Sequence, residues 1–170
     1  MAFGDTIATI DLSALSHNLA QVTKQIGNRK IIAVVKANAY GHGAIAVAQH
    51  LIQSSKQIAM LAVASLDEAI LLREAKISTP ILILTGCPAD RMKEVVSYNL
   101  TPTVFDTASL TALSCYAKTR SPIPIHIKVD TGMGRLGISP PKVVNFIQKT
   151  LASGLSVEGV FSHFAEADLS

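Results

Sequence analysis

Short apolar runs rich in β-branched residues recur along this 170-residue chain, and their starts lie 20 to 32 residues apart. Patterns typical of amphipathic helices lie between them, as at 44–53, 65–75 and 106–119. Strand and helix alternating at this spacing predict βαβ units, and therefore a parallel sheet that is buried on both faces. The six predicted strands are 31–35, 61–65, 81–84, 103–105, 125–129 and 157–161.

Polar residues follow most of these runs, and their distribution bears on how the sheet is closed. A (β/α)8 barrel gathers the carboxyl ends of all its strands on one rim, whereas an open sheet concentrates its chemistry at one switch point. The polar residues at strand ends are Lys36, Ser65, Thr85, Asp130 and His163. Because they follow nearly every unit, they favour the barrel.

The number of strands is too small for a complete barrel, which takes about 250 residues and eight strands. We therefore expect an α/β fold of the (β/α)8 TIM-barrel type, truncated to about six βα units. The segment 6–26 predicts one further strand and an amphipathic helix before the first unit. Ser65 and Asp106 are expected to be helix N-caps.

Composition excludes several classes of function. The longest apolar run, 58–64, has seven residues and is too short to span a membrane, and the amino terminus lacks a signal-peptide pattern. We expect a cytoplasmic, soluble protein. No basic cluster is present and aromatic residues are only 5%, which argues against nucleic-acid binding. Residues 12–66 contain no acid but five lysines and arginines, a balance that favours a small anion.

The segment IIAVVKANAYGHG, at 31–43, places Lys36 at the end of a predicted buried strand. Loss of hydration there favours the free amine, which is the form that attacks an aldehyde to make a Schiff base. The loop that follows is bounded by glycines, so its backbone amides can approach an anion, and Tyr40 offers a hydroxyl. A lysine reaching from a strand end into water is the ordinary alternative.

Three longer motifs extend this interpretation to a family. VVKANAYGHG (34–43), HIKVDTGMGRLG (126–137) and GVFSHFAEAD (159–168) resemble successive motifs of the alanine racemase family, and IDLSALSHNL (10–19) resembles its opening. The resemblance covers essentially the whole chain but only about the first half of a typical member. It implies that residues 1–170 are part of a barrel domain that binds pyridoxal 5'-phosphate, without the carboxyl-terminal barrel strands and β domain.

The resemblance also implies roles for individual residues. Lys36 would hold pyridoxal phosphate covalently and act as the base on one face of the substrate α-carbon. Tyr40 would contact the cofactor phosphate, and His163 would lie beside the pyridine ring. Arg135 would reach toward the phenolic oxygen of the cofactor and the substrate carboxylate. Lys128 matches a lysine that is carbamylated in many members, a modification that would turn one of two neighbouring cations into an anion that orients Arg135.

The activity implied is the interconversion of L-alanine and D-alanine, which supplies D-alanine for cell-wall peptidoglycan. The family works as a homodimer, and its second base is a tyrosine that the partner subunit contributes from the carboxyl-terminal half. We therefore expect the isolated chain to be inactive. No metal is expected, because the spacing of His163, Glu166 and Asp168 matches no zinc or calcium pattern.

Other functions stay open at this point. A barrel protein that binds or carries pyridoxal phosphate without catalysis is one alternative, and an amino-acid decarboxylase of the same fold is another. A dinucleotide-binding oxidoreductase is a third, because Gly132, Gly134 and Gly137 form G-x-G-x-x-G, and Glu158 follows about 20 residues later. Against it, Pro140 and Pro141 disfavour a helix that opens within the glycines.

Overall fold

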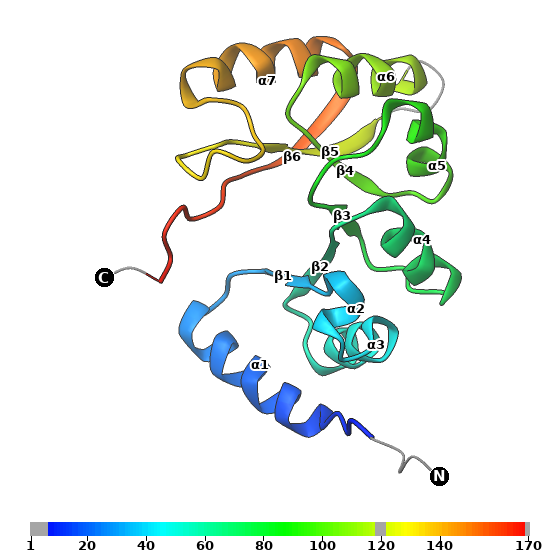
Figure 1. The fold of residues 1–170 in the computed structure, drawn as a ribbon, viewed down its shortest axis with the longest axis vertical. Coiled ribbons are helices and arrows are strands. Elements are labelled where there is room, and N and C mark those ends of the chain that lie inside the picture. Colours follow the sequence, from blue (N-terminus) through cyan, green and yellow to red (C-terminus); the bar gives the residue numbers. More distant parts are fainter. Residues whose placement is uncertain (1–6, 118–121, 169–170) are drawn as a thin grey trace, which may run out of the picture.

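The fold is built on six parallel strands that pair strictly in chain order, from β1 at one edge to β6 at the other (Figure 1). A computed structural model describes residues 7–117 and 122–168. The strands are β1 (Ile31–Val34), β2 (Ile58–Val63), β3 (Ile81–Ile83), β4 (Thr101–Val104), β5 (Ile123–Lys128) and β6 (Leu155–Phe161). All six predicted strands are therefore confirmed, and the curved, open sheet is the truncated α/β barrel that the sequence predicts.

Helices connect successive strands and lie mainly on the outer face of the curved sheet (Figure 1). The predicted helices and the Ser65 cap are confirmed, since α4 begins with Ser65 Oγ accepting from Glu68 N. The helices are α1 (Leu12–Ile26), α2 (Lys36–Tyr40), α3 (Ala44–Ser54), α4 (Leu66–Glu74), α5 (Met92–Ser97), α6 (Thr107–Ala117) and α7 (Val143–Ala152), with short 3-10 turns at Ala89–Arg91 and Pro140–Lys142.

The additional strand expected ahead of the first unit is absent from the described part of the segment. Residues 7–11 form no strand, and Ile7 is 81% exposed. They form no ladder with β1, and Thr9 and Ile10 border a hollow between α1 and β1. Instead, the Asp11 carboxylate caps α1 by accepting from the backbone N–H of Ser13 at 2.8 Å.

Alternate residues of each strand point to different cores. Leu61, Val63 and Ile81 belong to the large core beneath the helices. The opposite, concave face has only a small cluster around Ala62 and Leu82. Most of the apolar burial is therefore on the helix side, and the concave face retains space for a ligand.

The amino-terminal ends of the strands are tied together by Arg73 near the end of α4. Its guanidinium donates to the carbonyls of Ile77 and Thr79 before β3, at 2.7 and 2.8 Å. It also donates to the carbonyls of Tyr98 and Asn99 before β4, at 3.0 Å each. One side chain thus satisfies acceptors from two successive loops. Over the described ranges, no helix is long and apolar enough to cross a membrane.

Candidate functional site

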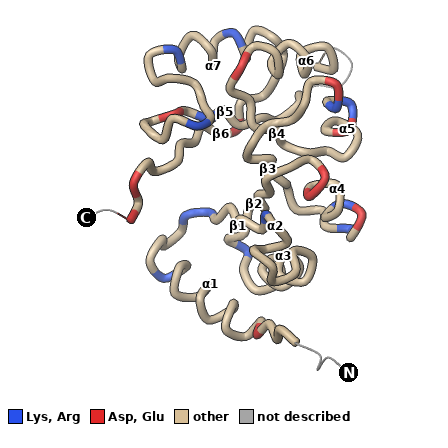
Figure 2. The backbone as a smooth tube through the Cα atoms, in the orientation of Figure 1, with Lys and Arg blue, Asp and Glu red and all other residues tan. Residues whose placement is uncertain are grey.

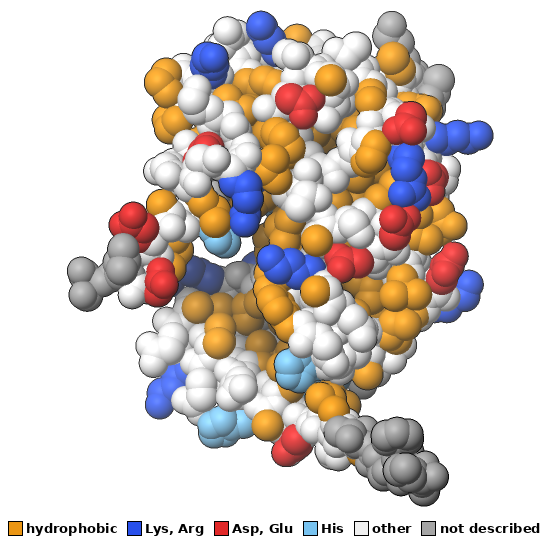
Figure 3. Space-filling view, in the orientation of Figure 1, with side chains coloured by type: hydrophobic (Ala, Val, Ile, Leu, Met, Phe, Trp, Pro, Cys, Tyr) orange, Lys and Arg blue, Asp and Glu red, His pale blue; other side chains and the backbone are white. Residues whose placement is uncertain are grey.

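A cavity of about 500 Å³ lies at the carboxyl ends of the strands, within the size range of small-molecule sites. All five residues singled out in the sequence line it: Lys36, Tyr40, Lys128, Arg135 and His163. They come from segments up to 127 residues apart, and the parallel sheet brings them to one rim. In the space-filling view a hollow with basic side chains and a histidine at its edge is visible on this face (Figure 3).

Lys36 follows β1 and is half-buried, with its Nζ 5.7 Å from the centroid of the Tyr40 ring. The residue before it, Val35, is buried and donates its backbone N–H to Ala62 O at 2.8 Å. The lysine is therefore attached to the last ladder bond between β1 and β2. Its amine enters the cavity from a rigid strand end, as the sequence predicts.

The segment after Lys36 is a left-handed turn, which the sequence did not predict. Ala37, Asn38, Ala39 and Tyr40 have φ values of 50°, 54°, 53° and 56°. Left-handed backbone costs a non-glycine residue roughly 1–2 kcal/mol, because Cβ approaches the following carbonyl oxygen. Four such residues in a row persist only where surrounding contacts hold them, and strained backbone of this kind is typical of ligand sites.

Local hydrogen bonds close this turn. The Asn38 side chain accepts from the backbone N–H of Ala44 at 2.8 Å, and the backbone carbonyl of Asn38 accepts from Gly43 N at 2.9 Å. A ring nitrogen of His42 lies 2.7 Å from Ala39 O. Asn38 thus links the turn to the start of α3, and asparagine is among the residues that best tolerate left-handed backbone.

Glu68 of α4 also contacts this turn. Its Oε1 accepts from Ala37 N at 2.7 Å, and its Oε2 accepts from Ala64 N at 2.7 Å and Ser65 N at 3.2 Å. Our sequence analysis missed this residue. The signal was available, since Ser65-x-x-Glu68 is a capping box, but the contact to Ala37 lies outside that motif.

Lys128 ends β5 and is only 6% exposed, with its Nζ 5.0 Å from the centroid of the Phe161 ring. Burial lowers the pKa of Lys128, and the positive charges of Arg135 and Lys36 add to that effect while Asp130 opposes it. The neighbouring cations therefore disfavour the ammonium form, as expected for Lys128 beside Arg135. A buried neutral amine is the form that reacts with carbon dioxide.

Arg135 is carried by the glycine-containing loop after β5. The Asp130 carboxylate accepts from Gly134 N at 3.0 Å and Gly132 N at 3.1 Å, and these bonds lower the pKa of Asp130. The loop returns to the strand end where Ile138 N donates to Lys128 O at 2.9 Å. Arg135 is thereby presented, exposed, at the border of the cavity.

The same loop rules out the dinucleotide alternative. Its amides at Gly132 and Gly134 are used by Asp130, so they are not free to cradle a pyrophosphate. No helix opens among the glycines, because the next helical turn starts only at Pro140. Glu158 lies within β6, where the pairing with β5 is irregular, and not at a strand end where it would meet a ribose.

His163 follows β6 and is exposed on the cavity side. Deeper in the sheet, a Cβ on Gly159 would lie 2.5 Å from the His126 ring, so only glycine leaves room for that imidazole. Burial lowers the pKa of His126 although the charge of Glu158 opposes this. His126 is thus a buried side chain of the sheet, and His163 is the histidine that lines the cavity.

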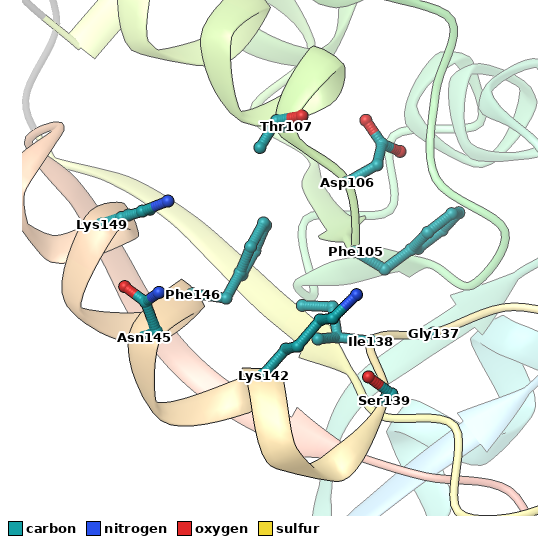
Figure 4. Close-up of a pocket in the computed structure, with 10 residues that line it drawn as sticks. All are labelled: Phe105, Asp106, Thr107, Gly137, Ile138, Ser139, Lys142, Asn145, Phe146 and Lys149. Atoms are coloured by element: carbon teal, nitrogen blue, oxygen red, sulfur yellow. The ribbon is translucent and has the colours of Figure 1, made fainter.

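A second cavity of about 480 Å³ lies between the start of α6 and α7 (Figure 4). Phe146 lies in its middle, with Lys142 and Lys149 at its border. None of the five predicted residues lines it. Over residues 7–117 and 122–168, no group of three or more His, Cys, Asp or Glu side chains is placed to hold a metal ion.

The donor set of the first cavity fits an anionic aldehyde. Lys36 supplies a primary amine, Tyr40 a hydroxyl and Arg135 a planar guanidinium, and the walls are apolar. Between residues 12 and 66 the charged side chains, counting histidine as neutral, are all lysine or arginine (Figure 2), and the Glu68 carboxylate that reaches the turn after Lys36 accepts from three backbone N–H groups. This charge balance favours a phosphate or carboxylate close to Lys36.

Comparison with known proteins agrees with this geometry. Residues 10–170 match the family model described as alanine racemase, N-terminal domain. The chain belongs to this family. It is 41% identical over 165 residues to an alanine racemase of Desulforamulus reducens, covering 95% of the chain and 44% of the relative. The corresponding protein of Halothermothrix orenii is 43% identical, with 96% and 43% covered.

Solved structures of the family have the same fold. Alanine racemase of Clostridium difficile 630 superposes with a TM-score of 0.87 at 33% identity, covering 96% of this chain and 45% of that one. The Bacillus anthracis enzyme with bound L-Ala-P superposes with a TM-score of 0.83 at 36% identity, covering 94% and 42%. The chain therefore spans less than half the length of the family members it matches.

Proposed function

We propose that this chain forms the cofactor-binding part of an alanine racemase that uses pyridoxal phosphate. The observation that carries the proposal is the convergence of all five predicted residues, from β1, β5 and β6, on one cavity. When bound, the cofactor acts as an electron sink that makes the α-proton of an amino acid acidic. The protein then needs to bind, orient, deprotonate and reprotonate.

The residues divide these tasks by their chemistry. We assign Lys36 Nζ to covalent attachment of the cofactor and to proton transfer at one face of the substrate α-carbon. The Tyr40 hydroxyl would donate to the cofactor phosphate, and the His163 ring would pack beside the pyridine. The Arg135 guanidinium would bind the substrate carboxylate and the phenolic oxygen of the cofactor.

Lys128 is assigned an indirect role. Its lowered pKa and its burial support carbamylation, which would place an anion beside Arg135 and remove the repulsion between the two cations. Racemisation also needs a proton source on the other face of the α-carbon. We propose that a partner subunit supplies it in a homodimer, that the substrate is alanine, and that the protein makes D-alanine in the cytoplasm. On this basis the isolated chain should show little or no turnover.

Borohydride reduction in the presence of pyridoxal phosphate, followed by peptide mapping, tests the assignment. We expect one strongly labelled peptide, containing Lys36. A Lys36→Met variant should lose that label and keep the same unfolding midpoint within a small margin, because the amine is not a core contact. Preferential labelling of any other lysine would refute the site.

A further inference from the structure

The left-handed turn after Lys36 is held from outside by one side chain. Within the described residues, the other hydrogen bonds of the turn join residues between positions 35 and 44. The exception is Ala37 N, which donates to Glu68 Oε1 at 2.7 Å. Glu68 lies 31 positions further along the chain and belongs to the next βα unit.

This contact completes a pair of anchors around the lysine. Val35 N, on one side of Lys36, donates to Ala62 O of β2 at 2.8 Å. Ala37 N, on the other side, donates to Glu68. The backbone is therefore bonded to the same neighbouring unit one residue before the lysine and one residue after it, which restricts the orientation of the lysine backbone between the two bonds.

The anchor itself is fixed at the end of β2. The second oxygen of Glu68 accepts from Ala64 N at 2.7 Å, and the carbonyl of Ala64 accepts from Thr85 Oγ1 at 2.6 Å. Thr85 follows β3 and lines the same cavity as Lys36. A continuous set of hydrogen bonds thus joins the carboxyl ends of three adjacent strands, with Glu68 at its centre.

We infer that Glu68 is a positioning residue for Lys36: its carboxylate holds the left-handed turn so that the amine is aimed into the cavity. The inference rests on the proposed function for what Lys36 does there. An ordinary capping box consists of the bond from Ser65 N to Glu68 Oε2 and the bond from Glu68 N to Ser65 Oγ. The bond from Oε1 to Ala37 goes beyond a cap and is the part that would act on the lysine.

Three variants separate positioning from capping. Glu68→Gln keeps the shape but leaves one acceptor oxygen, so it cannot accept from Ala37 N and from the N–H groups of residues 64 and 65 at once. Glu68→Asp keeps the charge and the cap but is one methylene too short to reach Ala37. Ser65→Ala is the matched control, because it removes the bond from Glu68 N to Ser65 Oγ and leaves Ala37 untouched.

The first measurement is the rate of covalent labelling of Lys36 by pyridoxal phosphate and borohydride, relative to the exposed Lys24 and Lys142 of the same molecule. Both Glu68 variants should label Lys36 about tenfold more slowly, as expected for losing a hydrogen bond to a charged group. Ser65→Ala should label at the native rate even where its unfolding midpoint is lower. Equal loss in Ser65→Ala, or native rates in both Glu68 variants, would overturn the inference.

The second measurement needs no cofactor, so it separates this inference from the proposed function. Amide hydrogen exchange at Ala37 should become about tenfold faster in Glu68→Asp, should rise in Glu68→Gln as well, and should stay unchanged in Ser65→Ala. If native Lys36 is not labelled, the proposed function fails, while exchange at Ala37 still decides whether Glu68 holds the turn. Native protection of Ala37 in both Glu68 variants would refute the positioning role.

Discussion

The two rims of the sheet are held together in opposite ways by the two ends of α4. At the amino-terminal rim, Arg73 donates to four backbone carbonyls of the loops before β3 and β4. At the carboxyl-terminal rim, Glu68 accepts from three backbone N–H groups after β1 and β2. The nine-residue helix α4 therefore stabilises the loops at one rim through its last turn and holds the candidate site at the other rim through its first turn.

The backbone shows the same difference. At the amino-terminal rim, left-handed residues occur singly, at Lys76 after α4 and Asn99 after α5. Such single residues are a common way to end a helix. At the carboxyl-terminal rim, residues 37–40 are left-handed in succession beside Lys36. Strain is thus concentrated where a ligand would bind, and the opposite rim has only ordinary helix ends.

The largest expected effect is on stability and comes from the amino-terminal rim. Arg73→Met should lower the free energy of unfolding by roughly 2–3 kcal/mol, because half-buried carbonyls lose a charged donor. Denaturant unfolding measures this. Labelling of Lys36 in the folded fraction should not change. Arg91→Met is the control, since the ion pairs of Arg91 with Asp67 and Glu94 lie near the surface, and its cost should be clearly smaller than that of Arg73→Met. If both variants lost the same free energy of unfolding, the bonds of Arg73 to the loop carbonyls would not be special for stability.

The next largest effect comes from the carboxyl-terminal rim, where one substitution should change both the stability of the fold and the labelling of Lys36. Asn38→Ala removes the acceptor for Ala44 N and replaces a residue that tolerates left-handed backbone, so unfolding should become easier by roughly 1–2 kcal/mol. Unlike Arg73→Met, it should also slow the labelling of Lys36. A stability loss with native labelling would mean that the turn does not direct the lysine.

A matched pair of glycine substitutions sharpens the contrast between the rims. Ala37→Gly and Lys76→Gly each relieve one left-handed residue, so each should stabilise the fold by about 0.5–1 kcal/mol after the entropy cost of glycine. Labelling of Lys36 should not become slower in either variant, because Ala37→Gly makes the left-handed turn easier to form and Lys76 lies on the opposite rim. Thermal or denaturant unfolding gives the first quantity and peptide mapping the second. Slower labelling in Lys76→Gly would contradict the separation.

The smallest expected effect is on how the free energy of unfolding changes with pH in the alkaline range. The pKa of Lys128 is lowered in the folded chain, so the unfolded chain binds more protons between that lowered pKa and the ordinary value of 10.5. Stability should therefore rise with pH through this window. Lys128→Met should flatten the rise in the free energy of unfolding, whereas removal of the exposed Lys142 should not. An unchanged slope in Lys128→Met would show that another group is responsible.

The sequence predicted what apolar patterning determines. A parallel sheet buried on both faces produces continuous apolar runs, so all six strands were found. Strand β2 begins at Ile58, three residues before the predicted start at 61, because Ile58 pairs with Ile31 of β1. The convergence of Lys36 and Arg135 followed from their positions at strand ends. The segment 7–11 was wrongly predicted as a strand because patterning does not show whether a partner exists.

Two features of the site could not be predicted from patterning. The alanines of KANAY favour right-handed helix, and nothing local in them indicates a left-handed turn. The bond between Glu68 and Ala37 joins residues far apart in sequence, and one Ser-x-x-Glu box looks like any other. Both arise from tertiary contacts that override local preference.

The two outer strands of the open sheet, β1 and β6, also affect how the chain behaves at high protein concentration. Within the described residues, β1 pairs only with β2 and β6 only with β5, while Ile32 and Val34 are 42% and 44% exposed. Outer strands with free backbone groups and apolar side chains can add further strands from any source. Self-association by this route depends on protein concentration. We therefore expect concentrated solutions to become turbid at temperatures below the unfolding midpoint.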